Sequence, residues 1–283
     1  MFGAIPACAM GSTLMVSNAM AADADVMKQL VPTGKLRVGI AYAPKPTPIF
    51  AAKDAAGEVR GVPRDLGDAL AKSLGVPVEL VVTATTNELT DKVVAGEIDI
   101  GFMPADDARR QRVDFSPSYF MIESTWLAGA NTNIKTAADV DTPEITVVGI
   151  DGSTTIRAAG RALKVAKIVP AKSVDEAMDM MKAGSVQAFA LTHDSLPPLQ
   201  AQLPGSRILD GAFQTTGVAI AVQKDRPAAL AYVKTFVEKA KTDGTVRKAF
   251  DSAGLNKLSI APWLGYLRMI FSRNRFTRFR IVR

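Results

Sequence analysis

The sequence contains very little cysteine and histidine. Cys8 is the only cysteine and His193 the only histidine among 283 residues. One cysteine excludes an intramolecular disulfide and a cysteine metal cluster. One histidine excludes most zinc sites and argues against a serine–histidine–aspartate hydrolase. His193 is followed by Asp194 and Ser195, but neighbouring residues of an extended segment point to alternate faces, so these side chains do not converge. An enzymatic site is therefore a minor alternative.

Basic residues are concentrated at the C-terminal end. Between Lys257 and Arg283 there are seven basic residues and no acidic ones. Because the whole chain has a formal charge of +6, the remaining residues carry a charge of only −1. A protein that binds nucleic acid would carry its basic patch on the folded domain, so we expect no nucleic-acid partner.

The same basic segment, residues 256–283, also contains aromatic and aliphatic residues at helical spacing. One face of such a helix would carry Trp263, Leu264, Leu267, Ile270 and Phe271. A basic amphipathic segment with aromatic anchors is typical of contact with an anionic membrane surface. The alternative is that this tail has no function.

The N-terminal segment has no charged residue before Asp23. Ala19-Met20-Ala21 fits the small-x-small pattern of signal cleavage, although a basic start is missing. The run is too interrupted to span a bilayer. We therefore expect residues 1–22 to be a signal-like leader and the protein to be exported; the alternative is a disordered leader.

Strand and helix patterns alternate through the first third of the chain. Residues 35–40, 76–82 and 97–103 form apolar runs of strand length. Amphipathic helix patterns lie between them and end at Gly75 and Gly96. Strand–helix–strand order requires right-handed crossovers, which predicts an α/β fold with a mostly parallel sheet.

The pattern then repeats. Residues 145–150 and 186–191 are predicted strands, and Ser173 with Glu176 forms a capping box before a helix. Two similar α/β units predict two lobes with a cleft between them. Ligands of open α/β sheets bind at the carboxyl ends of the strands, so the loops after these strands are the expected site.

Two extended segments, residues 124–129 and 216–224, are suited to cross between the lobes. We expect the first lobe to comprise residues 34–123 and 220–255, and the second lobe residues 127–215. Helices predicted at residues 227–241 and 245–252 would then return to the first lobe.

Several segments together resemble a known family. They are "AGEIDIGFMPADDARRQRVDFSPSYF" at residues 95–120, "VVGIDGSTT" at 147–155, "AGSVQAFALTHDSL" at 183–196 and "DSAGL" at 251–255. The combination resembles the family 3 extracellular solute-binding proteins, the amino-acid-type receptors of ABC importers, over roughly residues 34–256.

The resemblance implies a two-lobed periplasmic binding protein type II fold without a cofactor. It further implies a monomer that traps a small carboxylate or amino acid at the hinge and delivers it to an inner-membrane ABC permease. Alternatives on the same fold are a ligand-sensing module without transport and a dehydratase-like enzyme.

The resemblance also implies site residues. Six residues before Phe115 stands Arg109, in the position that holds the ligand carboxylate in the family. Arginine suits this role because its planar fork donates two parallel hydrogen bonds to one carboxylate. The alternative is that Arg109 forms a surface ion pair with Asp106 or Asp107. Backbone N–H groups at a helix start attract anions, so Ser153, Thr154 and Thr155 are the expected second-lobe contacts. The alternative is a simple helix cap by Ser153 or Thr154.

Other expected contacts are less firmly tied to the family pattern. Many members hold an α-ammonium with an acidic residue just after the second-lobe strand; here Thr192 stands in that position and Asp194 follows two residues later. Tyr42 and Phe50 are candidates for the stacking aromatic. The remaining candidates are Asn87, Met103 and Pro104.

Overall fold

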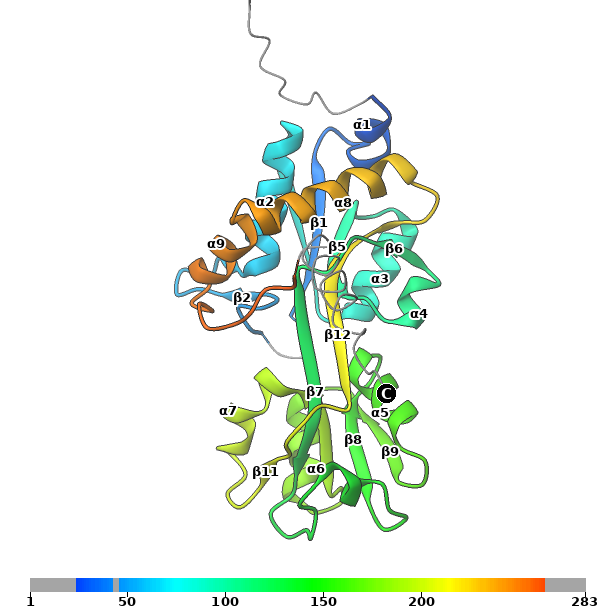
Figure 1. Ribbon diagram of the computed structural model, residues 1–283, viewed down its shortest axis with the longest axis vertical. Coiled ribbons are helices and arrows are strands. Elements are labelled where there is room, and N and C mark those ends of the chain that lie inside the picture. Colours follow the sequence, from blue (N-terminus) through cyan, green and yellow to red (C-terminus); the bar gives the residue numbers. More distant parts are fainter. Residues whose placement is uncertain (1–23, 43–45, 263–283) are drawn as a thin grey trace, which may run out of the picture.

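The computed structural model describes residues 24–42 and 46–262. The leader predicted at residues 1–22 and residues 263–283 of the predicted tail lie outside the described residues. The described chain forms two lobes, the first at the top of Figure 1 and the second at the bottom. Two long strands, β7 (Phe120–Ala128) and β12 (Gln214–Gln223), run from one lobe into the other. No helix in the described ranges is long and apolar enough to cross a membrane.

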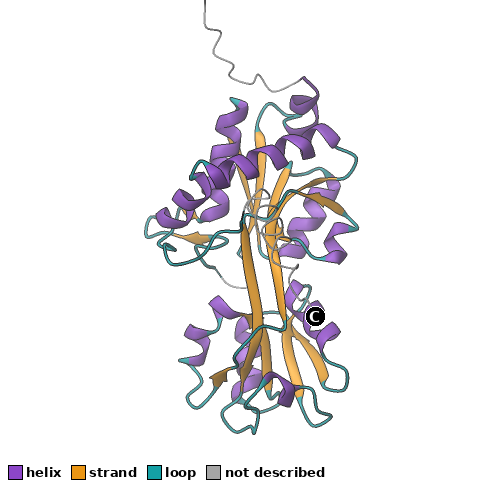
Figure 2. Cartoon of the chain, viewed as in Figure 1, coloured by secondary structure: helices purple, strands orange, loops and turns teal. Residues whose placement is uncertain are grey.

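The first lobe is built on three parallel strands. They are β1 (Leu36–Ala41), β4 (Val78–Thr83) and β5 (Ile100–Pro104), with β1 in the centre. Helices flank these strands (Figure 2). The other elements are α1 (Ala24–Leu30), β2 (Ala52–Lys53), β3 (Val59–Arg60), α2 (Val62–Leu74), α3 (Thr86–Ala95), α4 (Asp107–Arg110), β6 (Val113–Phe115), α8 (Pro227–Thr242) and α9 (Thr245–Ser252).

The second lobe repeats this arrangement with the parallel strands β8 (Thr146–Ile150), β9 (Lys167–Ala171) and β10 (Ala188–Thr192). Its other elements are the 3-10 turns η1 (Ala137–Val140) and η2 (His193–Ser195), the helices α5 (Thr154–Ala162), α6 (Val174–Lys182) and α7 (Pro197–Gln200), and the short strand β11 (Arg207–Ile208). Each lobe therefore has the predicted α/β character.

One sheet runs through both lobes. Its order is β4-β1-β5-β12-β7-β10-β8-β9, with β6 beside β12 and β11 beside β7. β12 pairs antiparallel with both β5 and β7, and β7 pairs antiparallel with β10. The parallel strands of each lobe are thus joined through two antiparallel strands at the centre. The carboxyl ends of both sets of parallel strands face the gap between the lobes.

Local sequence signals explain where the helices end. Gly75 and Gly96 adopt left-handed φ values of 71° and 70°, and their N–H groups bond to carbonyls of the last helical turn. Glycine tolerates this conformation because it lacks a Cβ atom. The ends predicted for α2 and α3 are confirmed, and α9 has the bounds predicted for it.

Two segments at the edges of the first lobe were not predicted to belong to it. In α1, Val26 and Leu30 are buried in the first-lobe core. At the other end, Ile260 forms a β-bridge with Phe120, and Lys241 Nζ donates to the carbonyl of Pro262 at 3.2 Å. Residues 256–262 thus contact the first lobe, although this lobe was predicted to end at residue 255.

Candidate functional site

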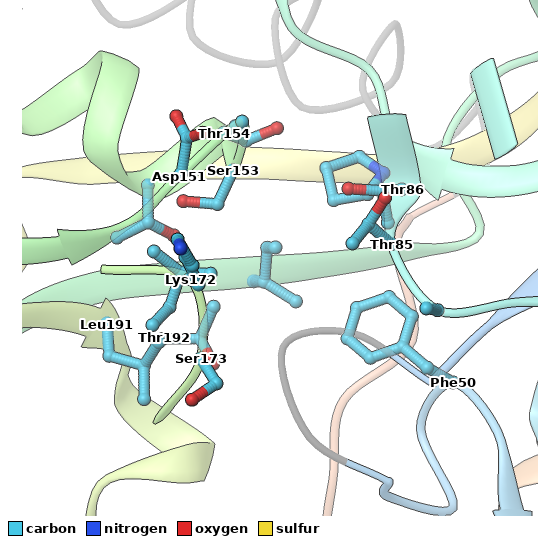
Figure 3. A pocket seen from close by; sticks show the side chains of 16 residues that line it. Phe50, Thr85, Thr86, Asp151, Ser153, Thr154, Lys172, Ser173, Leu191 and Thr192 are labelled. Atoms are coloured by element: carbon cyan, nitrogen blue, oxygen red, sulfur yellow. The ribbon is translucent and has the colours of Figure 1, made fainter. Parts of the chain in front are cut away.

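A cavity of roughly 280 Å³ lies between the lobes (Figure 3). This volume is near the lower end of the range for small-molecule sites, which suits a compact ligand. The first lobe and β7 contribute Phe50, Ala84, Thr85, Thr86, Pro104 and Ile122. The second lobe contributes Ile150, Asp151, Gly152, Ser153, Thr154, Thr155, Lys172, Ser173, Leu191 and Thr192.

Strand ends position this lining. Pro104 is the last residue of β5 and Thr192 the last of β10. Asp151 follows β8 directly, and Lys172 follows β9. Beyond the last residue of a strand, backbone N–H and C=O groups no longer bond to a neighbouring strand. The loops that begin there can carry polar side chains. This is the location at which open α/β sheets bind ligands.

The N-terminus of α5 forms part of the second-lobe wall. Ser153 is its N-cap, and its Oγ accepts a hydrogen bond from the N–H of Ile156 at 3.1 Å. The first turn of a helix has N–H groups without intrahelical acceptors, and the helix dipole adds a partial positive charge. Ser153 therefore acts as a cap, and the helix start that it opens favours an anionic ligand group.

Arg109 lies behind this lining and is not exposed to the cavity. Only 2% of the residue is accessible. Its Nη1 donates to the Pro104 carbonyl at 3.1 Å and to Thr154 Oγ1 at 2.6 Å. Its Nη2 donates to Thr86 Oγ1 at 2.6 Å and to the Gly152 carbonyl at 3.4 Å. The guanidinium therefore joins the two lobes through residues that line the cavity.

Burial lowers the pKa of Arg109 to about 10, with Asp106 opposing and Arg157 reinforcing this effect. The guanidinium remains protonated at neutral pH. Its Nε has no acceptor among the described residues. The Asp106 carboxylate lies 4.0 Å from its Nη1, but both side chains are buried, so the alternative of a surface ion pair is wrong.

Asp106 is the centre of a second set of contacts between the lobes. Its Oδ1 accepts from the Arg109 N–H at 2.9 Å and so caps α4. Its Oδ2 accepts from Thr154 Oγ1 at 2.9 Å, and from both Nε and Nη2 of Arg157 on α5. Burial raises the pKa of this carboxyl, but the Arg109 N–H and the Arg157 guanidinium outweigh burial, so the pKa lies below its usual value.

Six of the sequence-predicted site residues line the cavity: Phe50, Pro104, Ser153, Thr154, Thr155 and Thr192. Phe50 faces the second-lobe wall from the first lobe (Figure 3). Thr192 is buried, and its Oγ1 donates to Ser195 Oγ at 2.9 Å. Arg109 reaches the lining through its hydrogen bonds.

The other four predicted residues do not line this cavity. Met103 is fully buried in the first-lobe core and accepts a hydrogen bond from Thr90 Oγ1. Tyr42 packs against the same lobe's larger core cluster. Asn87 is exposed and lies so close to Gly152 that a methyl group there would clash with its amide.

Asp194 lies in a different groove. That groove is lined by Thr47, Pro48, Ile49, Asp194 and residues 254–258. Burial raises the pKa of Asp194, and hydrogen bonds from Thr192 and Ser195 oppose the shift only in part.

Two charged residues of the cavity, Asp151 and Lys172, were not predicted. Asp151 directly follows a strand that was predicted, so the rule of strand carboxyl ends could have found it. Lys172 follows β9, which was not predicted. Thr85, Thr86, Ile122, Ile150, Ser173 and Leu191 were also missed as lining residues.

Comparisons with known proteins agree with this architecture. Residues 36–253 match the family model of bacterial extracellular solute-binding proteins, family 3. The chain therefore belongs to this family. A glutamine-binding protein of Geobacillus stearothermophilus is 27% identical over 214 residues, covering 74% of this chain and 80% of the relative.

Two solved structures are also similar. One is from Wolinella succinogenes, is described as a candidate binding component of an ABC transporter and was solved with lysine. It has 28% identity and a TM-score of 0.65, with 78% of this chain and 95% of that chain covered. The other is an ancestral amino-acid-binding protein described as a precursor of cyclohexadienyl dehydratase. It has 29% identity and a TM-score of 0.64, with 80% and 98% covered.

Proposed function

We propose that this solute-binding protein is the periplasmic substrate-binding component of an ABC importer. It traps an amino acid or a related small carboxylate between its lobes and delivers it to an inner-membrane permease. The observation that carries the proposal is a small cavity between the lobes, with a buried arginine and a helix N-terminus held against its wall. The relatives named above support the amino-acid class.

In this proposal Arg109 changes partners when the ligand binds. Its Nη groups bond to Thr154 Oγ1 and the Gly152 carbonyl, both from the second lobe. A ligand carboxylate is the stronger acceptor because it carries a full negative charge and two oxygens in the plane of the fork. The carboxylate takes over these donors and itself links the lobes, which couples ligand binding to hinge closure.

The lining of the cavity gives little support to the dehydratase alternative. His193 and Ser195 are not among its lining residues, and the ancestral relative is itself described as an amino-acid-binding protein. A sensing module would need the same closing cleft, so it differs from a transport component only in its partner. Reconstitution with the candidate permease and measurement of ligand uptake would separate these two.

The first test compares two arginines in different settings: Arg109 is buried, whereas Arg112 is on the surface. Arg109→Ala should weaken ligand binding by about 2–5 kcal/mol, roughly thirty- to several-thousand-fold, because it removes one partner of a buried charge pair. Arg112 pairs with Asp91 at 2.8 Å on the surface, so Arg112→Ala should cost well under about 1 kcal/mol.

Calorimetry with a panel of amino acids measures both affinities, and circular dichroism checks that each variant is folded. Arg109→Lys keeps the charge but loses the fork, so it should also bind poorly. If the two alanine variants lose the same amount of ligand affinity, Arg109 does not bind the ligand.

A further inference from the structure

The cavity wall carries two charges of opposite sign, both from the second lobe. Among the lining residues only Asp151 and Lys172 are charged. They follow the neighbouring parallel strands β8 and β9, whose last residues, Ile150 and Ala171, are paired in register. The first-lobe wall is uncharged. Discrimination between ligands of different charge therefore depends on these two side chains.

The backbone at both positions is held in place. The Asp151 N–H donates to the carbonyl of Ala171 at 2.8 Å. The Lys172 N–H donates to Glu176 Oε2 at 2.7 Å, as part of the cap of α6. Both side chains therefore start from fixed points on one wall, opposite Phe50 and Thr85 (Figure 3).

Neither side chain has an ion-pair partner in the part of the chain that the structure describes. Within the described residues, Asp151 and Lys172 form no ion pair with each other or with any other residue, although each directly follows the last residue of one of the two paired strands β8 and β9. Other lysines of the chain do pair: Lys92 with Glu97 at 2.7 Å and Lys224 with Asp114 at 3.1 Å. Both cavity charges are thus available to a ligand.

Three charged groups can meet a ligand at this site. Lys172 and Asp151 are on the wall itself. The Arg109 guanidinium lies behind the wall, and its donors reach the lining residues Thr86 and Thr154. A ligand with two carboxylates and one ammonium group offers each of these three charges an opposite partner.

We propose that Lys172 and Asp151 determine specificity and select an acidic amino acid. This inference rests on the proposed function, in which Arg109 binds the α-carboxylate. Asp151 then binds the α-ammonium and Lys172 binds the second carboxylate of the ligand. Two carboxylates and one ammonium thus meet two cations and one anion, and each charge gains a charge-assisted hydrogen bond. A neutral amide side chain would leave Lys172 without an anionic partner, which discriminates against it.

The test uses ligands that differ in one charge. Calorimetry on the full chain would compare L-glutamate and L-aspartate with L-glutamine and L-asparagine. The wild type should bind an acidic amino acid more tightly than its amide. Lys172→Gln should weaken binding of the acidic ligand about tenfold or more, the effect of losing one hydrogen bond to a charged group. Binding of the amide should change about twofold or less, well below the tenfold step that such a bond represents.

Lys167→Gln is the matched control. It removes the same charge from the other end of the same strand, away from the cavity, and should alter no affinity. Asp151→Asn should weaken binding of L-glutamate but not of glutarate, which has both carboxylates and no ammonium.

The possible outcomes separate this inference from the function on which it rests. If the wild type binds the amide as tightly as the acid, or if Lys172→Gln and Lys167→Gln have equal effects, the specificity assignment is overturned while amino-acid binding stands. If the wild type binds no amino acid at all, the proposed function fails and the specificity assignment fails with it.

Discussion

Asp106→Asn should weaken the contact between the lobes without unfolding either one. The Asp106 side chain is only 1% exposed, and its Oδ2 bonds to Thr154 and Arg157 of the second lobe. Asparagine is as good an N-cap as aspartate, so α4 should keep its start. What is lost is the charge that attracts Arg157.

The magnitude follows from the burial of the two partners. Breaking a buried charge pair typically costs 2–5 kcal/mol, but the Arg157 side chain is 26% exposed and recovers part of its hydration. We therefore expect a loss near the lower limit, about 2 kcal/mol, which shifts the balance between closed and open forms about thirtyfold. If the closed form becomes the minor one, the apparent ligand affinity falls in proportion to the fraction of molecules that are closed.

Small-angle scattering of the ligand-free protein measures this shift directly. Asp106→Asn should have a larger radius of gyration than the wild type and should return to the wild-type value at saturating ligand. Because the pKa of Asp106 is lowered, the wild-type contact should persist at neutral pH and weaken only as the pH falls through that lowered pKa.

Two control variants test whether the effect comes from the contact between Asp106 and Arg157. Asp107→Asn removes the same charge from the next residue, which is exposed, and should leave the radius unchanged. Arg157→Gln should reproduce the effect of Asp106→Asn, and the double variant should be little worse than either single one, since both remove the same contact. Identical scattering from Asp106→Asn and Asp107→Asn would refute the reasoning.

Two further predictions concern the second groove and the tail. Asp194→Asn should raise the Tm at neutral pH, because burial raises the pKa of Asp194 and ionisation therefore costs the folded state stability. The gain over wild type should vanish below the ordinary aspartate pKa, and a lower Tm at neutral pH would contradict it. The full chain should sediment with anionic vesicles at low salt and less at high salt, whereas a version ending at Pro262 should stay in solution with an unchanged Tm. A version ending at Leu255 should melt earlier, because it loses the contacts of Ile260 and Pro262.

The sequence predicted those elements whose signals are local. Gly75 and Gly96 end their helices as expected, and Ser153 and Ser173 cap theirs through their own hydroxyl groups. Each of these signals acts within one turn of chain, so it can be recognised without knowledge of the tertiary fold.

Elements that depend on distant contacts were missed. The strand β9 contains Pro170 and lies at the edge of the sheet, so its sequence is not typical of a strand and it forms by pairing with β8. The helix α1 is short, and it is stabilised by the burial of Val26 and Leu30 against the first-lobe core. The antiparallel pairing of β7 and β12 joins residues far apart in the chain and leaves no local signal.

The same limit applies to the cavity. Phe50, Pro104 and Thr192 were identified because they lie near predicted strand ends or match a family position. Lys172 could not be placed in the cavity without β9. The engagement of Arg109 with the opposite lobe depends on how the lobes meet, which no pattern within either lobe encodes.

The position of β12 in the sheet also sets an order of assembly during synthesis. All strands of the second lobe, from β7 to β11, are complete once residue 208 has left the ribosome. The first lobe begins earlier but finishes later, because β12, α8 and α9 come from residues 214–252. Domains fold as units when their chain is available. The second lobe is therefore free to fold first, while β5 waits with an unpaired edge until β12 arrives to join it to β7.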